Sequence, residues 1–571
     1  MSEEDRIIEN SLPSVVIKSI KFNNGKEISF NSDDIVLLVG ANNVGKSRTL
    51  KDLNEDILQS DGTKILVNEV VYQTEYFTKE KITEYFERNV SKSNNDSYYI
   101  FISNNHQWTF SKNGFDSLKN DSKNFYKVFF SFLTTESRLQ MSKPIKLDYI
   151  EDKRSLNIFK KLEEDSKCIN ELNNILTDAF KKSIDVYEDY NDDGVSKEYK
   201  IGESEVINNA INSNKRDCIN ILKDLDGLHY QGDGIRSAVA ILSCLIVYEH
   251  SLFFIDEPET FLHPPQAKLI GKNISQLSKN KQCFIATHNI DFIKGVLEAD
   301  SSRVKIIKID RDGETNTYNV IDNDSIVAIS NDKNLKYTNI LDGLFYNRLV
   351  LCENESDCKF YASILETLNS EIYQNTLFCA VGGKDQFKKI VPLLKQLSIR
   401  FSVIADIDLI NNKANLKELL NAVSMDSYDA ISSKHNDFLV KFNQEMDTQV
   451  KTQETIKREI NNVFDDDKFI SDRAADRIKS ILKNISSFKL LKNGGRNIIP
   501  QGECVSLFDE INNYLKNNNI FILECGEIER FVPDISGHGN VWLEKVFQVY
   551  SDFNDGAYNN AKKFIKTVFN I

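Results

Sequence analysis

A glycine-rich segment near the start of the chain has the residue types and spacing needed to hold a nucleoside triphosphate. Residues 40–47 read GANNVGKS, and the apolar run 35–39 leads directly into them. In such a loop the glycines let backbone N–H groups wrap the phosphates at a helix N-terminus, a lysine reaches the β- and γ-phosphates, and a serine binds Mg²⁺. A glycine-rich turn with a surface lysine is the alternative. We predict that Ser47 binds Mg²⁺ and that the nucleotide is bound by Gly40, Asn42, Asn43, Gly45, Lys46, Ser47 and Arg48.

A second segment, residues 252–260 (LFFIDEPET), carries acids suited to nucleotide hydrolysis. Its apolar strand ends in Asp256, which we expect to join the Mg²⁺ ligands, and Glu257, which we expect to orient and deprotonate the attacking water. Another apolar run, 282–287, leads to His288. We predict that this histidine contacts the γ-phosphate, and a structural histidine is the alternative.

Acidic residues also follow apolar runs in the last part of the chain. Glu353 follows the run at 348–352, and Asp406 and Asp408 follow the run at 401–405. Because strands that alternate with helices form parallel sheets whose ligands gather at the C-terminal strand ends, we expect these carboxylates to share one edge. Clustered carboxylates repel one another unless a cation neutralises them, and oxygen ligands suit Mg²⁺ or Mn²⁺. Three solvated loop acids are the alternative.

The length and composition restrict the class of protein. With roughly 150 residues per domain, 571 residues correspond to between three and four domains. A formal net charge of −14 argues against a protein that coats nucleic acid by bulk positive charge. The longest apolar run, 238–248, is too short to cross a bilayer, the acidic N-terminus lacks the apolar part of a signal peptide, and the cysteines form no C-x-x-C pair. We therefore expect a cytoplasmic protein without membrane contact.

The elements that position the first site are interrupted by a long insertion. Residues 14–22 and 27–30 alternate apolar with polar around a turn, which predicts a β-hairpin ahead of the P-loop. The stretch between Lys46 and Gly232 is longer than an ATPase core needs. It contains strand-like segments and then helical-looking segments from about residue 124 to 182, without sustained heptads. We expect a compact dimerisation insert.

Residues 231–237 (QGDGIRS) precede an apolar helix that leads into the acidic strand. The order of P-loop, glycine-rich signature, acidic strand, ETFLHP turn and terminal histidine resembles the ABC-type ATPase heads shared by SMC and OLD-family proteins. This resemblance implies that ATP is the nucleotide, that two heads sandwich it, and that Gly232 and Gly234 of one head contact the γ-phosphate held by the other. The signature departs from the common LSGGQ form, and a helix-start loop is the alternative.

The last part of the chain resembles a Toprim domain, whose pattern is a glutamate after the first strand and a DxD after the third. A Toprim domain that follows an ABC-type head is the arrangement of the OLD family. The resemblance implies catalytic roles for Glu353, Asp406, Asp408 and Lys384. It also implies that the metal ligands of this half are Glu353, Asp357, Asp406, Asp408 and Glu529.

Two positions depart from the family pattern. Asn354 stands where a glycine is usual, and Cys525, in the late motif ECGEIE, stands where the family has a lysine. Such a lysine would stabilise the charge that builds on the scissile phosphate. Cleavage therefore requires a substitute, for which the sequence offers Lys384, Lys492 and Arg496.

These features predict an α/β chain: an ABC-type P-loop ATPase head with a dimerisation insert, followed by a Toprim-like parallel α/β domain with a helical insertion. The predicted parts are the ATPase head, first part, at 1–75; the insertion at 76–215; the ATPase head, second part, at 216–335; and the Toprim-like domain at 336–571, with its helical insertion at about 412–518.

The function predicted from these parts is an ATP-regulated, Mg²⁺- or Mn²⁺-dependent DNA endonuclease of the OLD type that serves in anti-phage defence. Its expected partners are DNA, a second copy of the chain, and a partner defence protein or other nucleic acid. The alternative is an ATPase switch or scaffold whose degenerate Toprim domain binds nucleic acid or a protein without cleaving. Asn354 and Cys525 favour this alternative.

Overall fold

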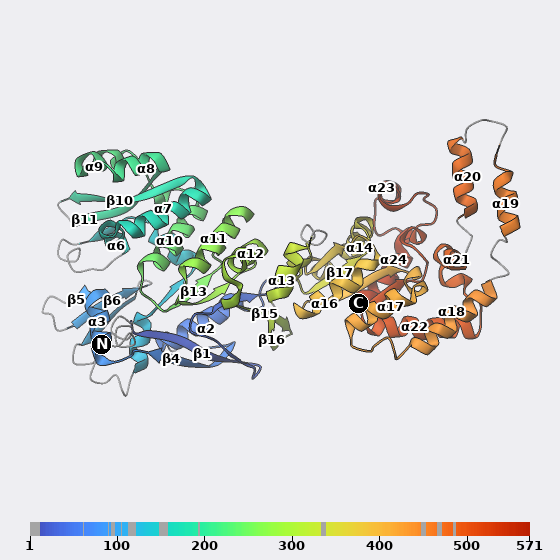
Figure 1. Ribbon diagram of the computed structural model, residues 1–571, viewed down its shortest axis with the longest axis horizontal. Coiled ribbons are helices and arrows are strands. Elements are labelled where there is room, and N and C mark those ends of the chain that lie inside the picture. The colour runs from blue at the N-terminus through green and yellow to red at the C-terminus, as the bar shows by residue number, and fades with distance from the viewer. Residues whose placement is uncertain are drawn as a thin grey trace, which may run out of the picture. The chain divides into compact units, whose positions relative to one another are not determined.

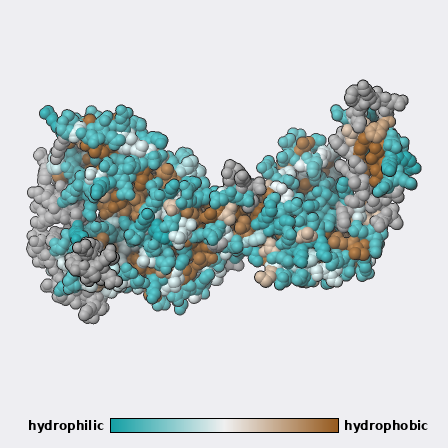
Figure 2. Space-filling model, in the orientation of Figure 1, coloured by the Kyte–Doolittle hydropathy of each residue, from teal (hydrophilic) through white to brown (hydrophobic). Residues whose placement is uncertain are grey.

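The computed structural model describes residues 12–60, 62–89, 91–92, 98–103, 106–111, 122–147, 158–191, 194–313, 315–321, 323–332, 339–446, 453–464, 471–482 and 487–571. The chain divides into two compact units, Met1–Val327 and Ala328–Ile571. The predicted boundary between residues 335 and 336 lies outside the described residues. Within the described ranges, no helix has both the length and the apolar character that crossing a membrane requires. Hydrophilic residues cover most of the face shown in Figure 2.

The centre of the first unit is a six-stranded sheet in the order β16-β15-β3-β14-β13-β8. Neighbouring strands are parallel except for the antiparallel pair β15–β16. The central strands are continuous apolar runs because both faces of the sheet are covered. The bounds are β3 (Ile35–Val39), β8 (Phe130–Leu133), β13 (Leu252–Asp256), β14 (Gln282–Ala286), β15 (Val304–Asp312) and β16 (Thr315–Ile321).

Helices and a small second sheet cover the main sheet. The hairpin predicted at 14–30 is present, and its strands pair with β4 in the antiparallel order β2-β1-β4. In Figure 1, α10, α11 and α12 are drawn above β13, while α2 and the small sheet are drawn below it. The bounds are β1 (Ser14–Phe22), β2 (Glu27–Ser29), β4 (Val67–Glu75), α2 (Lys46–Leu58), α10 (Asp233–Val247), α11 (Pro264–Leu277) and α12 (Ile290–Asp300).

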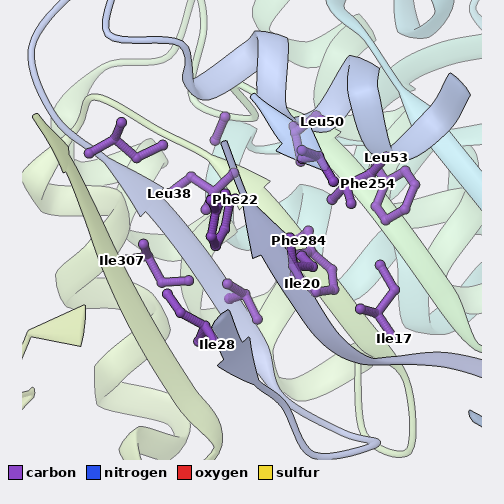
Figure 3. Packing of buried hydrophobic residues seen from close by; sticks show 14 of the residues in the cluster. Ile17, Ile20, Phe22, Ile28, Leu38, Leu50, Leu53, Phe254, Phe284 and Ile307 are labelled. Carbon is purple, nitrogen blue, oxygen red and sulfur yellow. The ribbon is translucent and has the colours of Figure 1, made fainter. Parts of the chain in front are cut away.

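The main sheet and its lower cover share one apolar core (Figure 3). Ile17, Ile20 and Phe22 of β1 pack with residues of the main sheet and with Leu50 and Leu53 of α2. Each fully buried side chain of this kind contributes roughly 1.5–3 kcal/mol of hydrophobic stabilisation. This core fixes the P-loop, which lies between β3 and α2, relative to the other strands of the sheet.

The insertion predicted at 76–215 is not wholly separate from the ATPase sheet. Residues 130–133, which we predicted to lie in a helical part of the insertion, form β8 and pair in parallel with β13. Their sequence, FSFL, is a short apolar run, for which periodicity cannot distinguish helix from buried strand. The other elements are α3 (Lys79–Asn89), β5 (Ser91–Lys92), β6 (Tyr98–Ser103), β7 (His106–Ser111), α4 (Thr135–Met141), β9 (Ile145–Leu147), α6 (Ile158–Glu164), α7 (Ser166–Phe180), β10 (Lys182–Asn191), β11 (Gly194–Glu203), α8 (Ser204–Ile211), α9 (Lys215–Lys223) and β12 (Asp226–Gly227).

The second unit is built on a four-stranded parallel sheet in the order β18-β17-β19-β20. Together the two units confirm the predicted α/β fold class. The principal elements are β17 (Arg348–Cys352), α14 (Glu355–Leu368), α15 (Ser370–Gln374), β18 (Thr376–Ala380), α16 (Phe387–Gln396), β19 (Phe401–Asp406), α22 (Glu503–Asn517), β20 (Ile520–Leu523), α23 (Gly539–Val549) and α24 (Asn559–Phe569).

The segment between β19 and β20 is helical, as predicted. Within the unit, Figure 1 shows α19 and α20 side by side. The helices of this segment are α17 (Lys413–Val423), α18 (Ser432–Met446), α19 (Gln453–Asn461), α20 (Asp472–Leu482) and α21 (Ser487–Gly494). Residues of α14, α23 and α24 form an apolar cluster that includes Trp542 and packs on strands of this sheet.

Candidate functional site

The predicted P-loop has a backbone that only glycine allows at two of its positions. Gly40 and Gly45 have φ angles of 146° and 101°. A Cβ atom on Gly40 would lie 2.2 Å from the carbonyl oxygen of Ile309, and one on Gly45 would lie 2.4 Å from Leu66 Cδ1. Asn43 also has a positive φ of 62°, which asparagine tolerates better than most residues. The loop is therefore held in one conformation by its neighbours.

Lys46 and Ser47 point back toward the loop and toward the acidic strand. Lys46 Nζ donates hydrogen bonds of 2.9 Å to the carbonyl oxygens of Gly40 and Ala41. Burial lowers the pKa of Lys46, although nearby carboxylates, Glu257 foremost, act in the opposite direction. Ser47 Oγ donates to Asp256 Oδ1 at 2.7 Å. The structure thus brings together the two side chains that we predicted to bind Mg²⁺.

A cavity of about 730 Å³ opens over the P-loop and contains Glu257 in its wall. The cavity also uses residues that the sequence analysis missed. Asn316 of β16 donates through Nδ2 to the carbonyl oxygen of Val44 at 2.5 Å and so supports the loop from the neighbouring hairpin. No local motif marks this asparagine, because only the pairing of β15 with β3 places it there. The other lining residues outside the predicted set are Asn23, Val44, Ile65, Leu66 and Arg311.

Glu257 and His288 lie beside each other at the ends of β13 and β14. Glu257 has a φ of 48°, which is uncommon outside glycine, and its N–H donates to the carbonyl oxygen of Ala286 at 2.9 Å. Strain of this kind is concentrated at functional sites. His288 Nδ1 lies 3.6 Å from Glu257 Oε1. The predicted base and the predicted γ-phosphate contact are therefore neighbours.

A third acid, Glu259, holds His288 in place and was not predicted. It is 3 % exposed, and it accepts hydrogen bonds from Thr287 Oγ1 at 2.8 Å and from the N–H of His288 at 2.9 Å. Its Oε1 also lies 3.3 Å from His288 Nδ1. Burial raises the pKa of Glu259. The sequence signal was present in the ETFLHP turn, but nothing in one sequence separates its glutamate from a surface acid.

The two signature glycines have different surroundings. Gly232 precedes the first turn of α10, and a Cβ atom there would meet nothing within 4 Å. A Cβ atom on Gly234 would lie 2.6 Å from the carbonyl oxygen of Phe261, so Gly234 lets α10 pack closely against the turn after β13. The predicted contact of both glycines with the nucleotide of a second head stays a prediction, because the structure contains one chain.

The predicted carboxylates of the second unit converge at one edge of its sheet. Ligand-capable oxygens of Glu353, Asp406 and Asp408 all lie within 4.8 Å of one another. Glu353 Oε1 accepts a 3.3 Å hydrogen bond from the N–H of Asp406. Burial, followed by repulsion from Asp406 and Asp408, raises the pKa of Glu353 to about 7. The proximity of three carboxylates favours a positive charge at this position.

Glu529 belongs to a second group of possible ligands. We predicted that Glu529 and Asp357 are both metal ligands, and one oxygen of Glu529 lies within 4.8 Å of ligand atoms of Glu527 and His538. Glu529 Oε1 lies 2.5 Å from His538 Nδ1 and accepts a hydrogen bond from the N–H of Gly539. Asp357 caps α14, where it accepts from the N–H of Asn354 at 3.1 Å, and its role as a metal ligand stays a prediction. Burial raises the pKa of Asp357 to about 6, and the negative charge of Glu529 also raises this pKa.

Two lysines approach the DxD motif from different elements. Lys384 Nζ lies 2.7 Å from Asp408 Oδ2, and Lys492 Nζ lies 2.7 Å from Asp406 Oδ2. Arg496, the third candidate for the missing positive charge, is bonded through both Nε and Nη2 to Asp509. Two of the three candidates therefore reach the carboxylate cluster.

The donor set fits a hard divalent cation. Carboxylate oxygens are the preferred ligands of Mg²⁺ and also suit Mn²⁺. Asp408 Oδ1 and Glu529 Oε2 are buried and have no hydrogen-bond partner within the described part of the chain. A buried carboxylate oxygen without a partner is costly, and a bound cation would remove that cost.

Comparison with known proteins adds to this picture. Residues 54–293 match the family model of an AAA ATPase domain, and residues 344–408 match the TOPRIM domain of overcoming lysogenization defect (OLD) protein-like sequences. The Old nuclease of Escherichia phage P2 is 22 % identical over 289 residues, which cover 49 % of this chain and 43 % of that protein.

The chain carries an ATPase domain followed by an OLD-like TOPRIM domain. Another relative, endonuclease GajA of Bacillus cereus, is 25 % identical over 232 residues, or 37 % of this chain and 38 % of that protein. The chain thus matches less than half the length of each of these relatives. Among solved structures, an SMC head bound to the C-winged helix domain of ScpA is 13 % identical, with a TM-score of 0.34 over 54 % of this chain and 98 % of that chain.

Proposed function

We propose that this chain is an ATP-regulated DNA endonuclease of the OLD type that depends on a divalent cation. The convergence of Glu353, Asp406 and Asp408 at one sheet edge carries the nuclease half of the proposal. Such a cluster would hold cations that activate water and neutralise the charge of a phosphodiester. Glu353, Asp406 and Asp408 would form one cation site, and Glu527, Glu529 and His538 would supply ligands for a second. Mg²⁺ and Mn²⁺ both fit the first set.

In the ATPase half, each predicted residue has a role that its position supports. Lys46 would bind the β- and γ-phosphates, and Ser47 with Asp256 would hold Mg²⁺. Glu257 would take the proton of the attacking water, with His288 next to it. We further propose that Gly232 and Gly234 act on the nucleotide of a second copy, and that ATP binding regulates cleavage.

Lys492 supports the nuclease over the non-cleaving scaffold. A Cβ atom on Gly526 would lie 2.2 Å from the carbonyl oxygen of Lys492, and one on Gly495 would lie 2.4 Å from that of Glu524. The segments that contain Lys492 and Cys525 are therefore in backbone contact. Burial raises the pKa of the Cys525 thiol to about 12, so it carries no charge at neutral pH. Lys492 therefore supplies a positive charge next to the segment that contains the uncharged Cys525.

Asn354, the other departure from the family pattern, is accommodated by the structure. The backbone N–H of Asn354 donates to the side chain of Asp357 at 3.1 Å, and the two residues form a capping box at the start of α14. This capping box gives the loop after β17 a defined conformation without glycine. Asn354 therefore does not argue for the scaffold. The proposed anti-phage role rests on the family resemblance alone.

The test of the proposed function is nicking of supercoiled plasmid by the full chain with Mg²⁺ or Mn²⁺ and ATP. We expect nicking by the wild type, loss of nicking in Asp406→Ala, and retention in Glu366→Ala, which changes an exposed acid of α14. ATP hydrolysis with no nicking by the wild type in either metal, with or without ATP, would favour the scaffold.

Replacing Lys492 should separate cleavage from ATP hydrolysis. Loss of one group that stabilises developing charge typically lowers a rate by roughly 10²–10³-fold, so we expect a decrease of that size in nicking by Lys492→Ala. ATP hydrolysis should be unchanged. Lys489→Ala, an exposed lysine of the same helix, is the control and should nick at the wild-type rate. Wild-type nicking by Lys492→Ala would show that the charge comes from elsewhere, with Lys384→Ala as the next variant to measure.

A further inference from the structure

Arg138, on α4 of the first unit, is fully buried and contacts both ATPase motifs that follow the insertion. It is 0 % exposed. Its Nε donates to Ser237 Oγ of α10 at 2.7 Å. Its Nη1 donates to the backbone carbonyl of Asp256 at 2.6 Å, and its Nη2 donates to that of Glu257 at 3.0 Å. One guanidinium therefore joins the helix that follows the glycine signature to the main chain of the proposed water-activating acid.

The remaining contacts of Arg138 leave it no donor for a ligand. Nη1 also donates to the carbonyl oxygen of Leu133 at 3.0 Å, and Nη2 donates to Thr135 Oγ1 at 3.2 Å. Since an arginine has five N–H groups, each of them now has an acceptor within the protein. Leu133 ends β8, which pairs with β13, so the same side chain also ties the edge of the sheet to the acidic strand. Arg138 is thus placed to fix geometry rather than to touch nucleotide.

The main chain that Arg138 holds has an unfavourable conformation. Glu257 has a φ of 48°, which a non-glycine residue adopts only when its surroundings hold it there. Its carbonyl is bound by Arg138, and its N–H is bound by the carbonyl of Ala286. The direction in which the Glu257 carboxylate points depends on these two restraints. A small displacement of a water-activating group is enough to slow a reaction by roughly 10²-fold.

We propose that Arg138 is a positioning residue for ATP hydrolysis. Its guanidinium couples the position of α10 to the orientation of Glu257. The inference rests on the proposed role of Glu257 as the base. A shift of α10 would move Ser237, and the guanidinium would pass that shift to the carbonyls of Asp256 and Glu257. Hydrolysis would then depend on the position of the signature helix. The connection between that helix and Glu257 runs through the single contact of Ser237 with Arg138.

Two variants test this with the full chain. Ser237→Ala removes only the bond to α10, and Arg138→Lys replaces the planar five-donor group by an ammonium that cannot span both sides. We expect kcat for ATP hydrolysis to fall roughly 10²-fold in Arg138→Lys. In Ser237→Ala we expect a smaller but measurable fall in kcat. KM and binding of a fluorescent ATP analogue should be unchanged. Ser243→Ala, a fully buried serine of the same helix that does not contact Arg138, is the matched control for stability and kcat.

The outcomes separate a positioning role from a structural one. If Arg138 only supported the fold, the variants would melt at lower temperature but keep kcat at temperatures where they are folded, and this result would overturn the inference. A higher KM with unchanged kcat would also overturn it. Should Arg138→Lys fail to fold, Ser237→Ala decides: a kcat no lower than that of Ser243→Ala contradicts the coupling. No ATP hydrolysis by the wild type would instead refute the proposed ATPase function.

Discussion

Glu257→Gln is expected to bind ATP and to lose hydrolysis. The glutamine keeps the size of the side chain and the backbone contact with Ala286, but it cannot accept the proton of the attacking water. General-base catalysis typically contributes 10²–10⁴-fold, so turnover should fall by roughly that factor. ATP should stay bound because Lys46, Ser47 and the P-loop backbone are unchanged. The measurements are steady-state phosphate release and binding of a fluorescent ATP analogue.

The contrast with Glu259 makes this prediction specific. Glu259 is buried and accepts hydrogen bonds through the same oxygen from Thr287 and His288, and a glutamine can accept both. We therefore expect Glu259→Gln to lower turnover much less than Glu257→Gln. Glu136→Gln, an exposed acid of α4, should hydrolyse ATP at the wild-type rate. If Glu259→Gln were inactive and Glu257→Gln active, the base would be Glu259 and our assignment would be wrong.

The sequence predicted best those site residues that directly follow a buried strand. The P-loop, the pair Asp256–Glu257, Glu353 and the DxD motif each come after a short apolar run. In a parallel sheet the ends of such runs meet at one edge, whatever the lengths of the connections between them. The same reasoning placed Glu353 near Asp406 and Asp408, and the structure brings their oxygens within 4.8 Å of one another.

Site residues that are brought together by contacts between distant segments of the chain could not be predicted in this way. Arg138 contacts Asp256 only because β8 pairs with β13 and α4 packs on α10. His538 reaches Glu529 through an irregular loop before α23, which no periodicity describes. Lys492 was named as one of three candidates, and its contact with Asp406 distinguishes it from Arg496, which is bonded to Asp509. Tertiary contact, and not local pattern, decided each case.

Glu353→Gln is expected to abolish nicking and, at the same time, to stabilise the protein above pH 7 when no divalent cation is present. The wild-type carboxyl has a pKa raised from 4.5 to about 7 by burial and by the charges of Asp406 and Asp408. The folded state therefore favours the protonated form. As the pH rises from about 4.5 through 7, ionisation of this group progressively reduces the stability of the folded state, and above 7 the whole cost is present.

The size of the effect follows from the shift in pKa. A shift of one unit corresponds to about 1.4 kcal/mol, so the change from 4.5 to about 7 amounts to an upper value of about 3 kcal/mol. Glutamine carries no charge at any pH, and its oxygen can still accept the hydrogen bond from the N–H of Asp406. With a chelator present, Glu353→Gln should be more stable than the wild type at pH 8 by up to this amount. Near pH 4.5 the two should be equal.

Divalent cations should reverse this order. A cation that binds only the folded state stabilises it in proportion to the logarithm of its concentration, and removal of one carboxylate from the Glu353, Asp406 and Asp408 set weakens that binding. Adding Mn²⁺ at pH 8 should therefore raise the melting temperature of the wild type and leave that of Glu353→Gln nearly unchanged. Glu366→Gln, an exposed acid of the neighbouring helix, should behave as the wild type in every condition.

The result that contradicts the metal assignment is a specific one. If Glu353→Gln were no more stable than the wild type at pH 8 in chelator, the three carboxylates would not be in repulsive contact. If Mn²⁺ raised the melting temperatures of both proteins equally, the cation would bind elsewhere. Activity and stability are linked because one arrangement causes both. The acids that the ends of β17 and β19 hold together make the folded protein less stable when no cation is present. The same acids are the ligands with which the folded protein can bind a cation.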